Sequence, residues 1–334
     1  MNTTYRILLS CLAACFTFQF SVRVEAQQHS THQSSISGKL DVGGGIHLFY
    51  EKIGNGKQKI IIPLGFWLSQ DFASLVNTDR TLVFYDMRGR GSSSYVKDST
   101  KITIQQEVED LEKLRQFLGF EKVNLIGESY LGFMVILYAM KYPQHVDNIV
   151  QIGAIPYRVT NQYPDSLKYA ISQVNPAKYK VLETKFHQSD HIKNPKEFSY
   201  LYWNTVDKVN LVHDTTYFKN MKKQWGDQFE YQNEWFVNFS RHIGALFQSI
   251  LKTEITPEDL TSVRQRVLTI HGRSDRNVAY GAGKEWASLL PNARLLTIPK
   301  AGHIPWIENP TLVFSSINTF LNGIWPQQSK KPNP

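Results

Sequence analysis

Short apolar segments recur along most of this chain, and segments with a helical pattern lie between several of them. The apolar segments are residues 46–53, 59–64, 81–87, 122–127, 148–154, 266–272 and 293–299. The later segments are apolar at nearly every position, which is typical of parallel strands buried on both faces. Strands that alternate with helices favour a wound α/β sheet, because parallel strands need a long crossover connection between them.

The helical segments carry their own start and stop signals. Thr103 precedes apolar residues that recur on one helix face, Gln106 completes a capping-box pattern, and Gly119 follows as a stop. Further helices are expected at residues 130–142, 281–290 and 311–321. The predicted fold class is therefore α/β, with a mostly parallel central sheet flanked by helices.

Residues 157–260 interrupt this alternation, since they contain no clear strand–helix pair. We interpret them as a mostly helical insertion, a cap packed on the sheet. We expect most aromatic residues of this insertion to pack between its helices and some to line an apolar pocket. They include Tyr200, Tyr202, Trp203, Trp225, Trp235 and Phe236. The core is then expected at residues 39–156 and 261–325, with a flexible leader at 27–38 and a loose tail at 326–334.

The first 26 residues have the pattern of an export signal. Arg6 precedes an apolar stretch, and residues 24–26 (VEA) fit a cleavage site that leaves Gln27 as the mature start. One alternative is an uncleaved anchor helix. The other is a lipoprotein site at Cys15, and we expect a membrane as a partner only if Cys15 is lipid-modified. The apolar residues after Cys15 make a poor lipoprotein tether, so we expect a secreted or periplasmic protein.

Composition narrows the chemistry further. Cys11 and Cys15 are the only cysteines and both precede Gln27, so the mature chain has neither disulfides nor thiol catalysis. The formal charge of +8 becomes +7 once residues 1–26 are removed, because that segment carries two arginines and one glutamate. No dense basic stripe is present, so we do not expect nucleic-acid binding.

Ser129 stands at the junction of a predicted buried strand and a predicted helix, in the sequence Gly127–Glu128–Ser129. A tight turn at such a junction lifts a serine oxygen out of the sheet. The following helix directs its free N–H groups toward developing negative charge. Ser129 is therefore the candidate nucleophile.

A serine nucleophile needs a base, and the base needs an orienting group. Asp275 follows the strand at 266–272, and His303 follows the strand at 293–299, so both should lie at the same sheet edge as Ser129. Asp275 and His303 are 28 positions apart, which leaves room for one helix and one strand. Each residue alone is an ordinary loop residue, but together they predict a catalytic triad.

At this point the chain resembles the α/β-hydrolase superfamily over about residues 38–324, with the segment FYDMRGRGSS at 84–93 similar to the proline iminopeptidase and esterase branch. The resemblance implies that Asp86 and Arg88 brace a turn and that the insertion is a cap domain. It also implies an oxyanion hole formed by the backbone N–H groups of Phe66 and Tyr130. Leu64 stands where histidine is usual, and Leu131 where glycine is usual.

The predicted function is an exported serine hydrolase that cleaves an ester or amide of a small substrate, with no metal or organic cofactor. Serine at position 129 disfavours the dehalogenase and epoxide hydrolase chemistries, which need aspartate there. A proline iminopeptidase is an alternative, but Gln232 stands where that family has an acidic anchor, with Glu234 nearby. A non-catalytic protein that binds a small ligand is the other alternative. The residues do not predict an oligomeric state.

Overall fold

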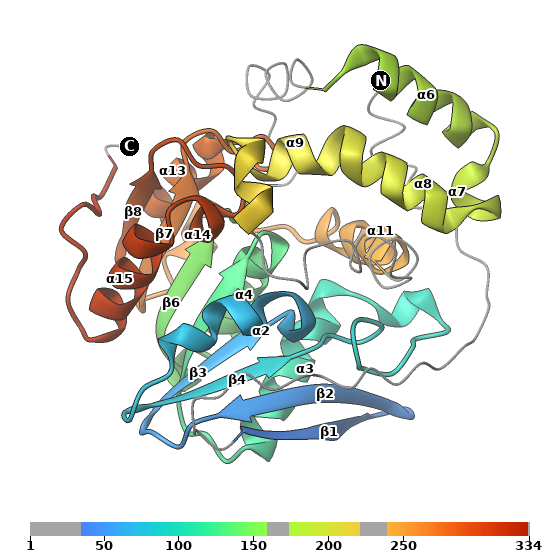
Figure 1. Ribbon diagram of the computed structural model, residues 1–334. Coiled ribbons are helices and arrows are strands. Elements are labelled where there is room, and N and C mark those ends of the chain that lie inside the picture. Colours follow the sequence, from blue (N-terminus) through green and yellow to red (C-terminus); the bar gives the residue numbers. More distant parts are fainter. Residues whose placement is uncertain (1–34, 159–173, 221–238, 333–334) are drawn as a thin grey trace.

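The computed structural model describes residues 35–158, 174–220 and 239–332 (Figure 1). One eight-stranded sheet forms the centre, in the order β1-β2-β4-β3-β5-β6-β7-β8. β1 pairs antiparallel with β2, and β2 antiparallel with β4, while all later pairs are parallel. The strands are β1 (Ser35–Gly43), β2 (Ile46–Ile53), β3 (Gln58–Pro63), β4 (Arg80–Tyr85), β5 (Val123–Glu128), β6 (Val146–Ile152), β7 (Arg266–Gly272) and β8 (Ala293–Ile298).

The predicted α/β class and its seven strands are confirmed, but an eighth strand was missed. β1 begins at Ser35, inside the segment expected to be a flexible leader, so the leader boundary at residue 38 is wrong. β1 is an edge strand in which only Leu40 and Val42 are buried. Because most of its residues are polar or exposed, the apolar pattern of the sequence does not predict it.

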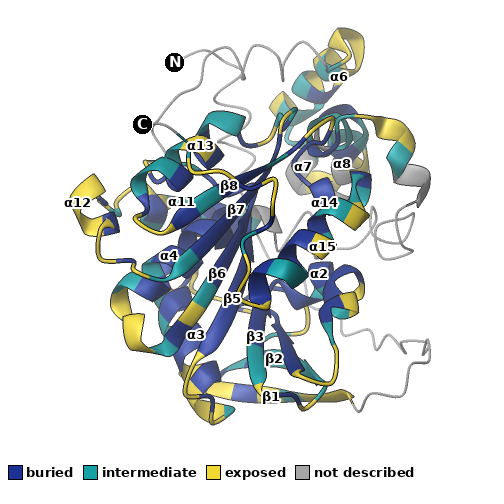
Figure 2. Ribbon diagram, turned by 90° about the vertical axis from the view of Figure 1, so that its left-hand side faces the viewer, coloured by how far each residue is buried: buried dark blue, intermediate teal, exposed yellow. Residues whose placement is uncertain are grey.

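Helices cover both faces of the sheet, with α3, α4 and α13 on one side and α2 and α15 on the other (Figure 2). Every residue of β4 and β5 is buried, as expected for strands between two helical layers. Thr103 caps α3 by accepting from the N–H of Gln106 at 3.1 Å, which is one half of the predicted capping box. The side chain of Gln106 donates instead to Asp110. The bounds are α2 (Gly65–Phe72), α3 (Ile104–Phe117), α4 (Tyr130–Lys141), α13 (Tyr280–Leu289), α14 (Pro305–Glu308) and α15 (Pro310–Leu321).

The described part of residues 157–260 is helical, and Figure 1 shows its α8 and α9 above the ends of the central strands. Trp203 is fully buried and belongs to the main core, so it serves packing. Trp225, Trp235 and Phe236 lie outside the described residues. The bounds are α6 (Pro176–His187), α7 (Asp190–Lys193), α8 (Pro195–Tyr202), the π-helical turn η4 (Trp203–Asp207), α9 (Lys208–Leu211), η5 (Thr215–Asn220), α11 (Phe239–Ile250) and α12 (Pro257–Leu260).

The C-terminal segment is docked, which corrects the expectation of a loose tail from residue 326. Lys330 pairs with Leu295 of the edge strand β8 through two backbone hydrogen bonds of 2.7 and 2.9 Å. Ser329 is buried. The open edge of β8 supplies unpaired backbone groups, and the tail satisfies some of them.

In the described part of the chain, no helix is both long enough and apolar enough to cross a membrane. The expected export signal, Cys11 and Cys15 lie outside the described residues.

Candidate active site

Ser129 occupies a strained turn between β5 and α4. Its φ of 56° and ψ of −125° are rarely adopted by a residue with a side chain. Its N–H donates to the carbonyl of Ile152 at 2.8 Å, which ties the turn to the end of β6. Strain at one residue between two regular elements is the geometry expected of a nucleophile elbow.

Two glycines explain how the elbow tolerates Leu131. A Cβ at Gly127 would lie 2.4 Å from the carbonyl oxygen of Leu131, and a Cβ at Gly132 would lie 2.6 Å from Cβ of Ala154. Glycine thus occupies both places where α4 approaches the sheet closely. Leu131 is fully buried and belongs to the core. Its departure from the usual glycine therefore leaves the elbow intact.

Asp275 and His303 meet, as their positions after β7 and β8 predict. Nδ1 of His303 lies 2.8 Å from Oδ2 of Asp275, and both side chains are buried. The other carboxylate oxygen, Oδ1, accepts from the N–H groups of Asn277 and Val278 at 2.8 Å each. The carboxylate is therefore fixed in one orientation against the imidazole ring.

The surroundings perturb both groups strongly. Burial opposes ionisation of Asp275, but His303 and His271 outweigh it and hold the pKa of Asp275 far below its usual range. Burial likewise lowers the pKa of His303, but the charge and hydrogen bond of Asp275, followed by those of Glu128, raise it to about 10. Perturbed pairs of this kind are concentrated at functional sites.

Glu128 contacts the imidazole ring of His303 on the side opposite Asp275. Its Oε1 lies 3.2 Å from Nε2 of His303. Among the described residues, the side-chain partner of Nε2 is Glu128 and not Ser129. The sequence analysis gave this residue no role, although an acidic residue next to a candidate nucleophile is a signal that could have drawn attention.

The two expected oxyanion donors differ in their surroundings. Tyr130 is the first residue of α4, so its N–H belongs to the group that is free of intrahelical partners at a helix start. The N–H of Phe66 instead donates to Oδ1 of Asp86 at 2.8 Å. In this conformation Phe66 is therefore not free to bind an oxyanion. The sequence could not show this, because the bond joins residues that are 20 positions apart.

Asp86 and Arg88 have the structural roles that the resemblance implied. Oδ2 of Asp86 accepts from the N–H of Ser92 at 2.7 Å, which closes the turn after β4. Arg88 forms a two-pronged ion pair with Asp110 of α3, with both nitrogen–oxygen distances at 2.6 Å. Both partners are buried, so the pair fastens this turn to α3.

The helical insertion holds the loops that carry Asp275 and His303. The carbonyl of Leu211 accepts from the N–H groups of His303 and Ile304 at 2.7 and 3.1 Å. Arg276 donates to the carbonyls of Val212 and His213 at 2.9 and 3.2 Å.

Glu308 of α14 reinforces the same connection. Its carboxylate accepts from the N–H groups of Gly302, His213 and Asp214. The sequence gave no sign of the roles of Arg276 and Glu308, because their partners lie more than 60 positions away or on another element.

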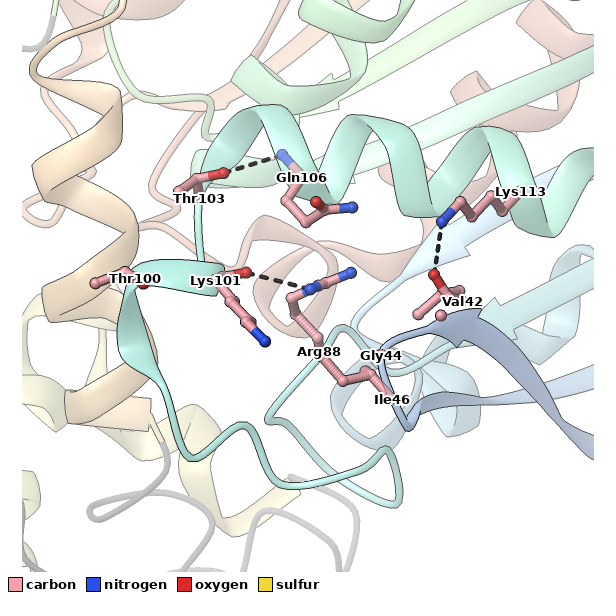
Figure 3. Close-up of a pocket in the computed structure, with 10 residues that line it drawn as sticks. Val42, Gly44, Ile46, Arg88, Thr100, Lys101, Thr103, Gln106 and Lys113 are labelled. Atoms are coloured by element: carbon pink, nitrogen blue, oxygen red, sulfur yellow. Dashed lines mark hydrogen bonds between the residues drawn. The ribbon is translucent and has the colours of Figure 1, made fainter.

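No group of three or more His, Cys, Asp or Glu side chains in the described ranges is arranged to hold a metal ion. A pocket of ≈ 390 Å³ lies between the β1–β2 turn and the start of α3 (Figure 3). Arg88, Lys101 and Lys113 line it, but Arg88 is bound to Asp110, and Lys113 donates to the carbonyl of Val42. The candidate residues Ser129, Asp275 and His303 are not among the residues that line it.

Comparison with known proteins agrees with this fold. The family model described as the alpha/beta hydrolase fold matches residues 54–310. The chain belongs to the α/β-hydrolase family. It is 31% identical over 300 residues to a proline iminopeptidase from Saccharolobus solfataricus, covering 84% of this chain and 91% of that protein.

Solved structures of the α/β-hydrolase family share the fold at low identity. A proline iminopeptidase from Mycobacterium smegmatis matches with a TM-score of 0.65 at 15% identity, covering 86% of this chain and 98% of that one. A 2-hydroxy-6-oxo-6-phenylhexa-2,4-dienoate hydrolase from Rhodococcus matches with a TM-score of 0.64 at 18% identity, covering 87% and 99%. The iminopeptidase alternative depends on an acidic anchor at or near Gln232 and Glu234. Both residues lie outside the described part of the chain.

Proposed function

We propose that this α/β hydrolase is a serine hydrolase that cleaves an ester or amide of a small substrate through an acyl-enzyme. The observation that carries the proposal is the contact between His303 and Asp275 at the sheet edge where Ser129 sits in its strained turn. A buried imidazole oriented by a carboxylate is what a serine needs as its base.

The proposed reaction has two steps. His303 takes the hydroxyl proton of Ser129 at Nε2 while Oγ bonds to the substrate carbonyl carbon, and Tyr130 N–H stabilises the oxyanion. The bond to the leaving group then breaks, and His303 gives that group the proton. His303 then takes a proton from water while the water oxygen bonds to the acyl carbon. The bond from that carbon to Oγ breaks, and His303 returns the proton to Oγ, which releases the acid and regenerates Ser129. Asp275 holds the imidazole and stabilises its charged form throughout.

A fluorophosphonate probe tests this directly, because it reacts far faster with an activated serine than with an ordinary serine hydroxyl. The purified mature protein should acquire one adduct, located on Ser129 by mass spectrometry. Ser129→Ala and His303→Ala should abolish labelling while circular dichroism shows a retained fold. A folded wild-type protein that acquires no adduct would overturn the triad.

A second candidate function is a proline iminopeptidase. The observation that favours it is the 31% identical relative from Saccharolobus solfataricus, which is named as that enzyme. Hydrolysis rates of a prolyl amide and of simple acyl esters separate the two proposals. A strong preference for a free N-terminal proline favours the iminopeptidase, whereas comparable or faster ester cleavage favours the general hydrolase.

A non-catalytic ligand-binding role would give a different pattern. Such a protein would saturate with a small ligand without turnover, and Ser129→Ala would leave the affinity unchanged. The paired His303 and Asp275 support the enzyme instead.

A further inference from the structure

Glu128 faces the nitrogen that catalysis needs. In the proposed mechanism Nε2 of His303 must be unprotonated to accept the proton of Ser129. Asp275 contacts Nδ1, on the other side of the ring, and leaves Nε2 open. Glu128 lies 3.2 Å from Nε2 and is itself buried, so a carboxylate contacts the nitrogen that must accept the serine proton.

The charged groups around the ring come from several elements. Glu128 at the end of β5 and Asp275 after β7 contact the imidazole directly. His271 of β7 lies 3.2 Å from Asp275, and Glu308 of α14 accepts from the N–H of the preceding residue, Gly302. Two buried carboxylates therefore share one imidazole, an arrangement that favours its protonated form.

We propose that Glu128 is a positioning residue that holds His303 as an imidazolium in the resting enzyme and thereby sets the lower pH limit of activity. This inference rests on the proposed function. To become a base, His303 must release its Nε2 proton to solvent and leave Glu128. The neutral ring then turns to Ser129 and accepts its proton.

The direction of the effect follows from the charges. Although burial lowers the pKa of His303, Asp275 and then Glu128 raise it to about 10. Removing the charge of Glu128 withdraws one of these two stabilising partners. An opposite charge at this range shifts a pKa by roughly one to three units, so Glu128→Gln should lower the pKa of His303 by about one unit or more.

The titration of His303 measures this without reference to activity. The protein is labelled with ¹³C in its histidine rings, and the His303 signal is assigned by its loss in His303→Asn. Its pKa is then read from chemical shift against pH in the wild type and in Glu128→Gln. Equal values in the two proteins would overturn the proposal.

The rate of labelling by the fluorophosphonate, measured against pH, supplies the functional readout. On the acid side, the labelling rate of Glu128→Gln should fall at a lower pH than that of the wild type. The difference in pH should equal the decrease in the pKa of His303. Glu109→Gln is the matched control. Glu109 binds Lys141 and Tyr142 at the far end of α4, about 18 Å along the helix from Ser129, so its profile should follow the wild type.

The two proposals fail in different ways. If no protein is labelled at any pH, the serine hydrolase function falls, and the titration of His303 still decides the role of Glu128. If labelling occurs but both the acid side of the labelling profile and the titration are unchanged in Glu128→Gln, the function stands and this inference falls.

Discussion

Gly153 lies directly against the imidazole ring of His303. A Cβ at this position would be 2.9 Å from Nδ1 and 3.1 Å from Cε1 of the ring. Gly153 also has a φ of +55°, a conformation that residues with side chains seldom adopt. The absence of a side chain at the end of β6 therefore makes room for the candidate base.

Gly153→Ala should impair catalysis more than folding. The new methyl would displace the His303 ring, and a shift of about 1 Å costs on the order of 100-fold in rate. The matched control is Gly119→Ala, since Gly119 has a φ of +67° but nothing within 4 Å of its Cβ position. Both variants should lose about 1–2 kcal/mol of unfolding free energy from backbone strain. Equal kcat/KM values for the two variants would contradict the assigned contact.

Asp275→Asn should reduce kcat by about 10⁴-fold. The N–H groups of Asn277 and Val278 require an oxygen at the Oδ1 position, so the new amide would present its NH₂ group to His303. That NH₂ would donate to Nδ1 and force the ring proton onto Nε2, where it blocks acceptance from Ser129. Steady-state kinetics measures the loss, and Asp259→Asn at the exposed cap of α12 should keep full activity. Retention of more than a tenth of the rate by Asp275→Asn would argue against the triad.

Arg88→Met should lower the unfolding free energy by about 3–5 kcal/mol, because it leaves the buried carboxylate of Asp110 without its partner. Urea unfolding measures the loss, and Arg88→Met combined with Asp110→Leu should restore part of it. A single variant as stable as the wild type would show that the pair adds little.

The loss in Arg88→Met should also depend on pH. Burial raises the pKa of Asp110, and Arg88 opposes this rise. Without Arg88 the folded state holds a proton on Asp110 well above the unfolded pKa of about 3.9, so stability falls as pH rises from there. The difference from the wild type should therefore be larger at pH 7 than at pH 4.

Export should produce a mature protein that begins at Gln27. Intact mass and N-terminal sequencing of protein collected outside the cytoplasm would measure this. Ala26→Arg should block cleavage, because a small residue is needed just before the cut. A mass that corresponds to a lipid-modified Cys15 would instead identify a lipoprotein anchored to a membrane.

Several parts of this molecule could be predicted because they depend on local patterns. Apolar runs located the seven strands from β2 to β8, and the cap at Thr103 marked the start of α3. Ser129, Asp275 and His303 follow β5, β7 and β8, and the contact between Asp275 and His303 was expected from these positions. β1 and the docked C-terminal tail could not be predicted in this way, because they bury few apolar side chains and so have no clear hydrophobic pattern.

The wound α/β sheet, and the position of three candidate catalytic residues at one of its edges, follow from strand periodicity and chain order alone. The groups that contact these residues can be identified only in the folded molecule. The N–H of Phe66 is bound to Asp86, Glu128 faces His303, and Gly153 makes room for that ring. These contacts depend on side-chain direction and on pairing between distant segments, and neither leaves a periodic signal in the chain.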